Sequence, residues 1–184
     1  MKFGEAKNLI WKILDEYSSN GQVQVDDDYR LRMADVLNAQ MKRLATVAKV
    51  TKAYTVPTVV SDRPQAYPMP DDFYQLNQLW ADMKPIGRGQ WLGEQLVLPG
   101  NEKREIIVDY YAFPADVTDD TPDETKLDLR DDACVCACYF AAAGLTLADL
   151  VVDSGKILAV ANQMLETMRK DTERSMFIIR DDLV

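Results

Sequence analysis

The most apolar run of the chain is the 13 residues from Ala133 to Leu145, which include no charged side chain and are mostly small. Asp131 and Asp132 precede it and suit the first turn of a helix, because the N-terminal end of the helix dipole is positive. A helix that is apolar on every side has to be buried on every side. We therefore expect part of its burial to come from a neighbouring subunit, with four subunit-contact candidates: Cys134, Cys138, Tyr139 and Phe140.

All three cysteines lie in this run, at positions 134, 136 and 138. A structural zinc site needs four ligands, usually two Cys-x-x-Cys pairs or cysteines combined with histidines. This chain has no histidine, and on a helix only Cys134 and Cys138 share a face. A redox pair would have the Cys-x-x-Cys spacing. We interpret the cysteines as small apolar core residues, and we predict neither a metal nor another cofactor.

The net charge of −9 argues against a broad surface that binds nucleic acid, because phosphate contacts rely on clusters of Lys and Arg. The one basic cluster, Lys42, Arg43, Lys49 and Lys52, lies near the end of a predicted helix, where cations complement the dipole. A contact with DNA or with an acidic partner remains open for it. The apolar run from Ala133 to Leu145 is shorter than the roughly 20 residues that a helix needs to cross a bilayer, so we expect no membrane partner.

The acidic stretch from Asp116 to Glu124 does not match a calcium loop, because the required glycine is missing and Pro122 interrupts the pattern. Hydrolysis by paired carboxylates has no supporting motif here. Gly87-Arg-Gly89 lacks the Lys-Ser/Thr that completes a phosphate-binding loop. With no histidine to act as a general base, the sequence predicts a protein that is not an enzyme.

Helical spacing of apolar residues predicts helices from Phe3 to about Ser18, from Asp26 to about Val47, from Asp131 to about Leu150, and from about Ser154 to near the C-terminus. Between them, β-branched and aromatic residues predict strands at 52–60, 91–98 and 104–112, with a loop at 61–70. We predict an α+β fold, mainly α. It has a four-helix core, from two N-terminal and two C-terminal helices, with an inserted small antiparallel β-sheet.

The segment Tyr67-Pro-Met-Pro-Asp-Asp-Phe73 predicts a rigid corner. Its prolines restrict the backbone, and its aspartates can accept hydrogen bonds from nearby backbone groups. Apolar side chains after the corner are expected to anchor it in a core. The corner residues are Tyr67, Pro68, Pro70, Asp72, Phe73 and Trp80.

The order of these features resembles that of the head-to-tail connector (adaptor, or head completion) proteins of tailed bacteriophages, especially the tail accessory factors of short-tailed phages. The resemblance covers residues 5–170 approximately. It is carried by the N-terminal helical pair, the 67–73 corner with Leu76 and Trp80, Leu98-Pro99 leading into Ile106–Ala112, Pro114 with Thr118–Thr121, and the Ala-rich helix at Tyr139–Leu145.

The resemblance implies one connector domain, 1–184, with a helical pair at 1–50, a β insertion at 52–112 and a helical pair at 131–184. It implies a structural virion protein, made in the host cytoplasm, of which about twelve copies form a ring at the head–tail junction. Its partners would be the portal protein and the tail or nozzle proteins. DNA would pass through the ring without sequence-specific binding.

By the same analogy the C-terminal segment docks on the portal. The portal-docking candidates are Met176, Phe177, Ile178, Ile179, Arg180, Leu183 and Val184. The alternative for this segment is a plain helix end packed in the subunit's own core. The alternatives for the whole chain are another phage neck or tail-completion component, and a non-viral helical adaptor domain that binds a protein partner through its C-terminal helix.

Overall fold

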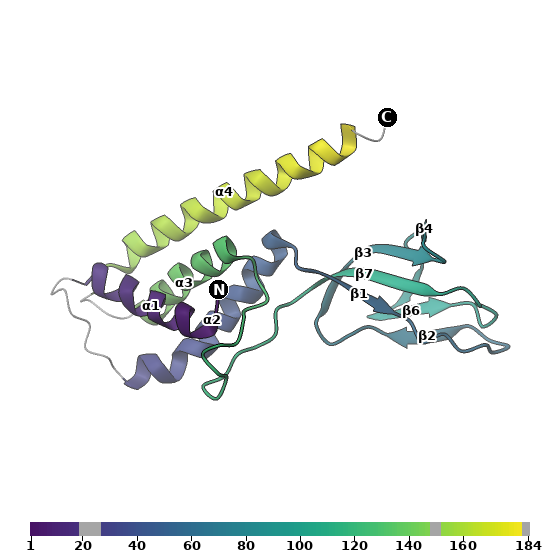
Figure 1. Cartoon of the computed structure of the whole chain (residues 1–184), viewed down its shortest axis with the longest axis horizontal. Coiled ribbons are helices and arrows are strands. Elements are labelled where there is room, and N and C mark those ends of the chain that lie inside the picture. Colours follow the sequence, from purple (N-terminus) through teal and green to yellow (C-terminus); the bar gives the residue numbers. More distant parts are fainter. Residues whose placement is uncertain (19–26, 148–151, 182–184) are drawn as a thin grey trace. The chain divides into compact units, whose positions relative to one another are not determined.

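The computed structural model describes the backbone of residues 1–18, 27–147 and 152–181, and the side chains of 1–18, 28–147 and 152–172. The chain forms two compact units (Figure 1). The helical unit comprises Met1–Ala48 and Pro114–Val184, and the β unit comprises Lys49–Phe113. Within the described ranges the helices are α1 (Phe3–Glu16), α2 (Asp27–Ala48), α3 (Asp131–Leu145) and α4 (Ser154–Asp181).

Helix α3 is the centre of the helical unit, and α1, α2 and α4 all pack against it. Ten of its 15 residues are buried, which is the outcome expected for a helix without charged side chains after its first turn. Each neighbour contributes an apolar stripe at helical spacing. The stripes are Phe3, Ala6, Ile10, Ile13 and Leu14 of α1, Tyr29, Met33, Leu37, Met41 and Leu44 of α2, and Ile157, Ala161, Leu165 and Met168 of α4.

Small side chains on α3 allow the neighbouring helices to come close. The sulfur of Cys136 lies 3.5 Å from the carbonyl oxygen of Ala161 in α4, and the sulfur of Cys138 lies 3.8 Å from that of Ala6 in α1. A Cβ added at Gly144 would lie 3.2 Å from Cγ1 of Val36 in α2. Larger residues at these positions would push the surrounding helices away from the core.

The β unit has seven described strands in two antiparallel sheets. The first sheet has the order β1-β7-β3-β4 and the second has the order β2-β6-β5. One buried cluster, which includes Leu79, Leu96 and Val108, takes side chains from both sheets. The strands are β1 (Thr51–Thr55), β2 (Gln65–Pro68), β3 (Phe73–Ala81), β4 (Lys84–Ile86), β5 (Gln90–Leu92), β6 (Gln95–Leu98) and β7 (Ile106–Ala112).

The predicted fold class is therefore wrong. In place of one small sheet on a four-helix core of two pairs, the structure has three helices around α3 and a β unit with two sheets and its own core. The prolines of 61–70 led to the prediction of a loop where strand β2 lies. Pro68 is compatible with this strand because it stands at the end of an edge strand. The predicted strand 91–98 is instead a hairpin of β5 and β6, because Gly93 turns the chain with φ +60°.

The hairpin of β3 and β4 turns through two residues with positive φ, Asp82 (47°) and Met83 (62°). Two positive values define a type I′ turn, which favours Asn or Asp followed by Gly. Asp82 fits this turn, and its Oδ1 accepts a hydrogen bond from the backbone N–H of Glu105 at 3.0 Å. Met83 occupies the position that favours glycine, and its side chain is 74% exposed.

Replacing Met83 with glycine should raise the free energy of unfolding of the β unit by about 0.5–1 kcal/mol. Glycine removes the left-handed penalty of about 1–2 kcal/mol, part of which its own larger entropy loss on folding offsets. Urea unfolding followed by tryptophan fluorescence measures the change. The matched control is Gly93→Ala, at φ +60°, where an added Cβ would have nothing within 4 Å, so its lower stability would come from the backbone conformation alone. A less stable Met83→Gly variant would contradict the strain at this turn.

Candidate functional site

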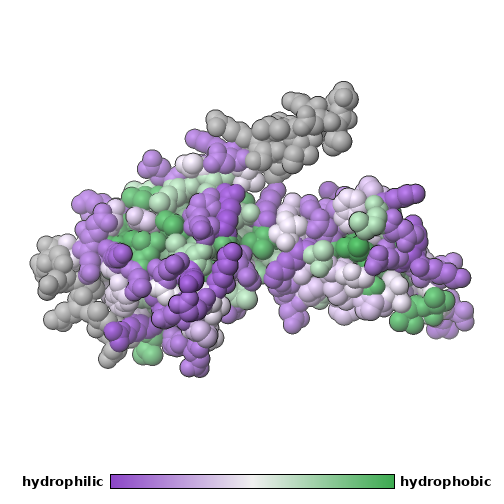
Figure 2. All heavy atoms as spheres, in the orientation of Figure 1, coloured by the Kyte–Doolittle hydropathy of each residue, from purple (hydrophilic) through white to green (hydrophobic). Residues whose placement is uncertain are grey.

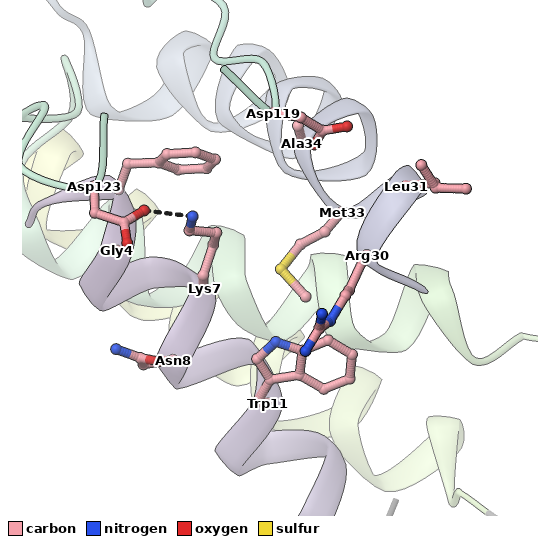
Figure 3. Close-up of a pocket in the computed structure, with 11 residues that line it drawn as sticks. Gly4, Lys7, Asn8, Trp11, Arg30, Leu31, Met33, Ala34, Asp119 and Asp123 are labelled. Atoms are coloured by element: carbon pink, nitrogen blue, oxygen red, sulfur yellow. Dashed lines mark ion pairs between the residues drawn. The ribbon is translucent and has the colours of Figure 1, made fainter. Parts of the chain in front are cut away.

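The segment that joins the β unit to α3, residues 114–130, is rich in aspartate, and we call it the acidic connector. The helical unit contains a cavity of about 420 Å³ between α1, the first half of α2 and this acidic connector (Figure 3). Buried side chains of Phe3, Met33 and Ala34 form its apolar base. The Trp11 ring also lines it, with its centroid 6.4 Å from that of Tyr29. The remaining lining residues are Gly4, Lys7, Asn8, Arg30, Leu31, Asp119 and Asp123.

The charges around this cavity differ in their pairing. Lys7 forms an ion pair with Asp123, and its ammonium lies 4.6 Å from the centroid of the Phe3 ring. In Figure 3 the Arg30 side chain reaches toward Trp11. Within the described residues, neither Arg30 nor Asp119 takes part in an ion pair. The cavity therefore combines an apolar interior with one cation and one carboxylate that are available to a partner.

The acidic connector is held to the helices by charges and by backbone hydrogen bonds. Asp116 pairs with Lys42 at 2.7 Å, and Glu124 pairs with Lys2. The first-turn N–H groups of α1, which have no partner within the helix, donate to connector carbonyls: Phe3 to Thr125 at 2.8 Å and Gly4 to Asp123 at 2.9 Å. In the described part of the chain, no group of acidic or cysteine side chains is arranged to hold a metal ion.

The four residues of the basic cluster have separate surroundings. Lys42 pairs with Asp116, and the Arg43 guanidinium lies 4.4 Å from the centroid of the Phe140 ring. In the β unit, Lys49 lies 5.3 Å from the centroid of the Tyr111 ring. Lys52 pairs with Asp72 at 2.8 Å. The cluster is therefore divided between the helical unit and the β unit.

All three cysteines are buried, and each sulfur faces a different carbonyl oxygen: Leu129 for Cys134, Ala161 for Cys136 and Ala6 for Cys138. Burial raises the pKa of the thiols to about 11 for Cys134 and Cys136, and to about 12 for Cys138. The thiolate, which is the reactive form, is thereby suppressed near neutral pH.

The burial of α3 needs no neighbouring subunit, which corrects the reason for expecting one. Cys134, Cys138 and Phe140 are buried within the chain itself, and Tyr139 is partly buried. The error came from judging α3 without its neighbours, because α1, α2 and α4 together cover it. Of the four, only Tyr139 keeps part of its surface exposed in the single chain.

Around the predicted corner, Asp72 is the most connected residue. Its carboxylate accepts hydrogen bonds from Lys52 Nζ at 2.8 Å and from the Tyr110 hydroxyl at 2.9 Å, and its carbonyl accepts one from the N–H of Phe113 at 2.7 Å. Burial raises the pKa of Asp72, but the bonds from Lys52 and Tyr110 outweigh it and the pKa is lowered overall. Burial and the bond to Asp72 raise the pKa of Tyr110 to about 12.

Of the other corner residues, Phe73, Pro70 and Tyr67 make contacts near the corner, whereas Pro68 and Trp80 are described by their places in the strands. The Phe73 ring stacks on Trp91 at 5.8 Å, its N–H donates to the carbonyl of Pro70 at 2.9 Å, and the Tyr67 hydroxyl accepts from the N–H of Val59 at 2.9 Å. Pro68 ends β2. Trp80 lies further along β3, opposite Ile107 of β7, and takes no part in these contacts.

The portal-docking candidates lie where the structure describes the backbone alone or describes nothing. Met176, Phe177, Ile178, Ile179 and Arg180 belong to helix α4 by backbone, but their side chains are not among those described, and Leu183 and Val184 lie outside the described residues. The last described side-chain contact of α4 is that of Thr172. Its hydroxyl donates to the carbonyl oxygen of Met168 at 2.9 Å and lies 3.4 Å from that of Val47.

No protein-family model and no curated protein sequence matches the chain. Within the described residues, no helix is both long enough and apolar enough to span a membrane. The cavity was not predicted, because its lining comes from three segments that are separated along the chain. Phe3, Lys7 and Trp11 follow one another at intervals of four residues, so they lie on one side of α1. This spacing is the sequence signal for the side of α1 that lines the cavity.

Replacing Gly4 with alanine should lower the free energy of unfolding of the helical unit by about 1–2 kcal/mol, because the added Cβ would lie 2.8 Å from the Cβ of Asp123. The matched control is Gly155→Ala in α4, where the nearest atom is 3.4 Å away and stability should rise by about 0.5 kcal/mol. Urea unfolding followed by circular dichroism at 222 nm measures both. Equal effects would show that the connector does not pack closely on α1.

The cysteines of the native protein should react with a thiol reagent at pH 8 at least about a hundredfold more slowly than in urea, because the pKa of each thiol rises from 9.0 to about 11 or 12 on burial. Since the unfolded thiols ionise first, the contribution of these groups to stability is complete below pH 9. It should fall as pH rises from 9 through 11 to 12. Rapid labelling of folded protein would contradict the burial of α3.

Proposed function

We propose that this chain is a structural virion protein, a head-to-tail connector that forms a ring beneath the portal, joins the capsid to the tail and extends the DNA channel. The observation that carries the proposal is the insertion of a self-contained β unit, Lys49–Phe113, into a helical unit made of the segments before and after it. This is the order of elements that the resemblance to phage connectors implies. The same corner that carries the resemblance, 67–73, links the two sheets of the β unit.

The charge of the chain also supports this role. A net charge of −9 repels phosphate, so a channel wall of this composition would let DNA slide without holding it.

Helix α4 supports the proposed docking segment. It has 28 residues, and α3 has 15, so their lengths are about 42 Å and about 22 Å. Among the side chains of α4 that the structure describes, 154–172, the buried ones extend from Ile157 to Met168, and the helix backbone continues to Asp181. We assign residues 176–184 to the portal, and the first six of them, 176–181, belong to this helix.

The proposal predicts that the purified protein, mixed with a portal protein from the same genome, forms one complex whose mass equals the portal ring plus a ring of about twelve copies of this chain. Mass photometry with and without portal measures this. Removing residues 176–184 should abolish the complex while the thermal unfolding curve of the rest is retained.

Three results would argue against parts of this account. A stable dimer without affinity for portal would contradict the connector function. Unchanged binding after removal of 176–184 would contradict the docking segment and leave the connector function standing. Binding of the isolated C-terminal helix to a non-phage partner would favour the adaptor alternative.

A further inference from the structure

We propose that the β3–β4 hairpin of one copy of this chain inserts Met83 into the Trp11 cavity of a second copy, and that this contact joins neighbouring subunits of the ring. The proposal rests on the connector function, because it needs several copies held side by side. It names the surface on each copy that meets the other.

The hairpin tip has the properties of an inserted knob. Met83 is 74% exposed and has the highest exposure among the large apolar side chains of the described residues. It occupies a left-handed position that favours glycine, and a strained residue of this kind points to a role outside its own turn. On the face drawn in Figure 2, apolar atoms of the β unit gather in small separate patches, which suits point contacts rather than one broad apolar interface.

The cavity has the matching properties. Its volume of about 420 Å³ exceeds that of one side chain, and its base is apolar through Phe3, Met33 and Ala34. Trp11 adds an aromatic ring to the wall. Methionine is unbranched and adaptable, and its sulfur makes favourable contacts with aromatic rings, so Met83 is well suited to this surface.

The charges next to the knob complement those around the cavity. Asp82 and Lys84 flank Met83, and Arg30 and Asp119 lie at the cavity. Among the described residues, neither Lys84 nor Arg30 nor Asp119 forms an ion pair within the chain. Insertion of the hairpin can place Asp82 near Arg30 and Lys84 near Asp119, so that Arg30, Lys84 and Asp119 each gain a partner of opposite sign, whereas Asp82 already lies near Arg104 of its own chain.

A contact of this type is also compatible with a ring. The knob and the cavity are different surfaces, so each copy offers both, one to each neighbour. An interface between unlike surfaces is heterologous, and it produces rings when the rotation closes. A contact between like surfaces would stop at a dimer.

Disulfide trapping tests the contact directly. Leu31 lines the cavity and is 68% exposed, and the native cysteines are buried. A mixture of Leu31→Cys and Met83→Cys chains, assembled with portal and mildly oxidised, should give a covalent dimer. A chain that carries both substitutions should give a ladder of covalent oligomers. The matched control replaces Leu31→Cys with Leu147→Cys, which is 70% exposed but does not line the cavity, and should give neither product.

Charge exchange provides a second test. Lys84→Glu should weaken subunit association by roughly two- to fivefold, and adding Asp119→Lys should restore it. Met83→Gly removes the knob and leaves the turn intact, so it should lower the ring population without loss of folding.

The outcomes separate this contact from the function on which it rests. Rings that form on the portal but give no disulfide between positions 31 and 83 would overturn the contact and leave the connector function standing. If no ring forms on the portal, the connector function fails and the contact fails with it. Trapping at 31 and 83 but not at 147 and 83, together with rescue by Asp119→Lys, would establish the contact.

Discussion

The helical unit depends on the covering of α3. Because ten of its residues are buried and none after its first turn is charged, α3 cannot leave any side open to water. Its alanines, cysteines and glycine let α1, α2 and α4 approach closely, so that the sulfurs of Cys136 and Cys138 meet the backbones of α4 and α1. The acidic connector then follows the outside of α1, where its carbonyls satisfy the first N–H groups of that helix. The Trp11 cavity lies where α1, α2 and this connector meet.

The β unit can be inserted into this helical unit because its two ends lie together. Helix α2 stops before Lys49, whose φ of 51° is typical of a left-handed helix end. The β unit begins at Lys49 and ends at Phe113, and next to these ends the N–H of Ala112 donates to the carbonyl of Val50 at 2.8 Å. An insertion with adjacent ends adds little loop-closure cost to the surrounding fold. The two sheets bury one common cluster, so the β unit has its own core.

The sequence predicts the helices and β7 to within a few residues, because their apolar periodicity is continuous over many residues. It predicts α3 as too long, since Thr146 bonds back to the carbonyl of Ala142 and the helix ends at Leu145. The sheets are harder to predict. Strand β3 has two register shifts that break its alternation, and β2 follows a proline. The cavity could not be predicted at all. An exposed residue such as Leu31 is common on protein surfaces, and only the fold shows that it lies beside residues of α1 and of the acidic connector.

The connector account joins three features: an inserted β unit, a helix α4 whose backbone continues to Asp181, and a net charge of −9. Its central claim is that the protein completes the junction between head and tail. If the account is right, electron microscopy of phage particles made without this gene tests that claim most directly. The account predicts capsids that lack tails and have lost or are losing their DNA, with normal tails restored when the gene is supplied separately. Tailed, DNA-filled virions in its absence would contradict the account.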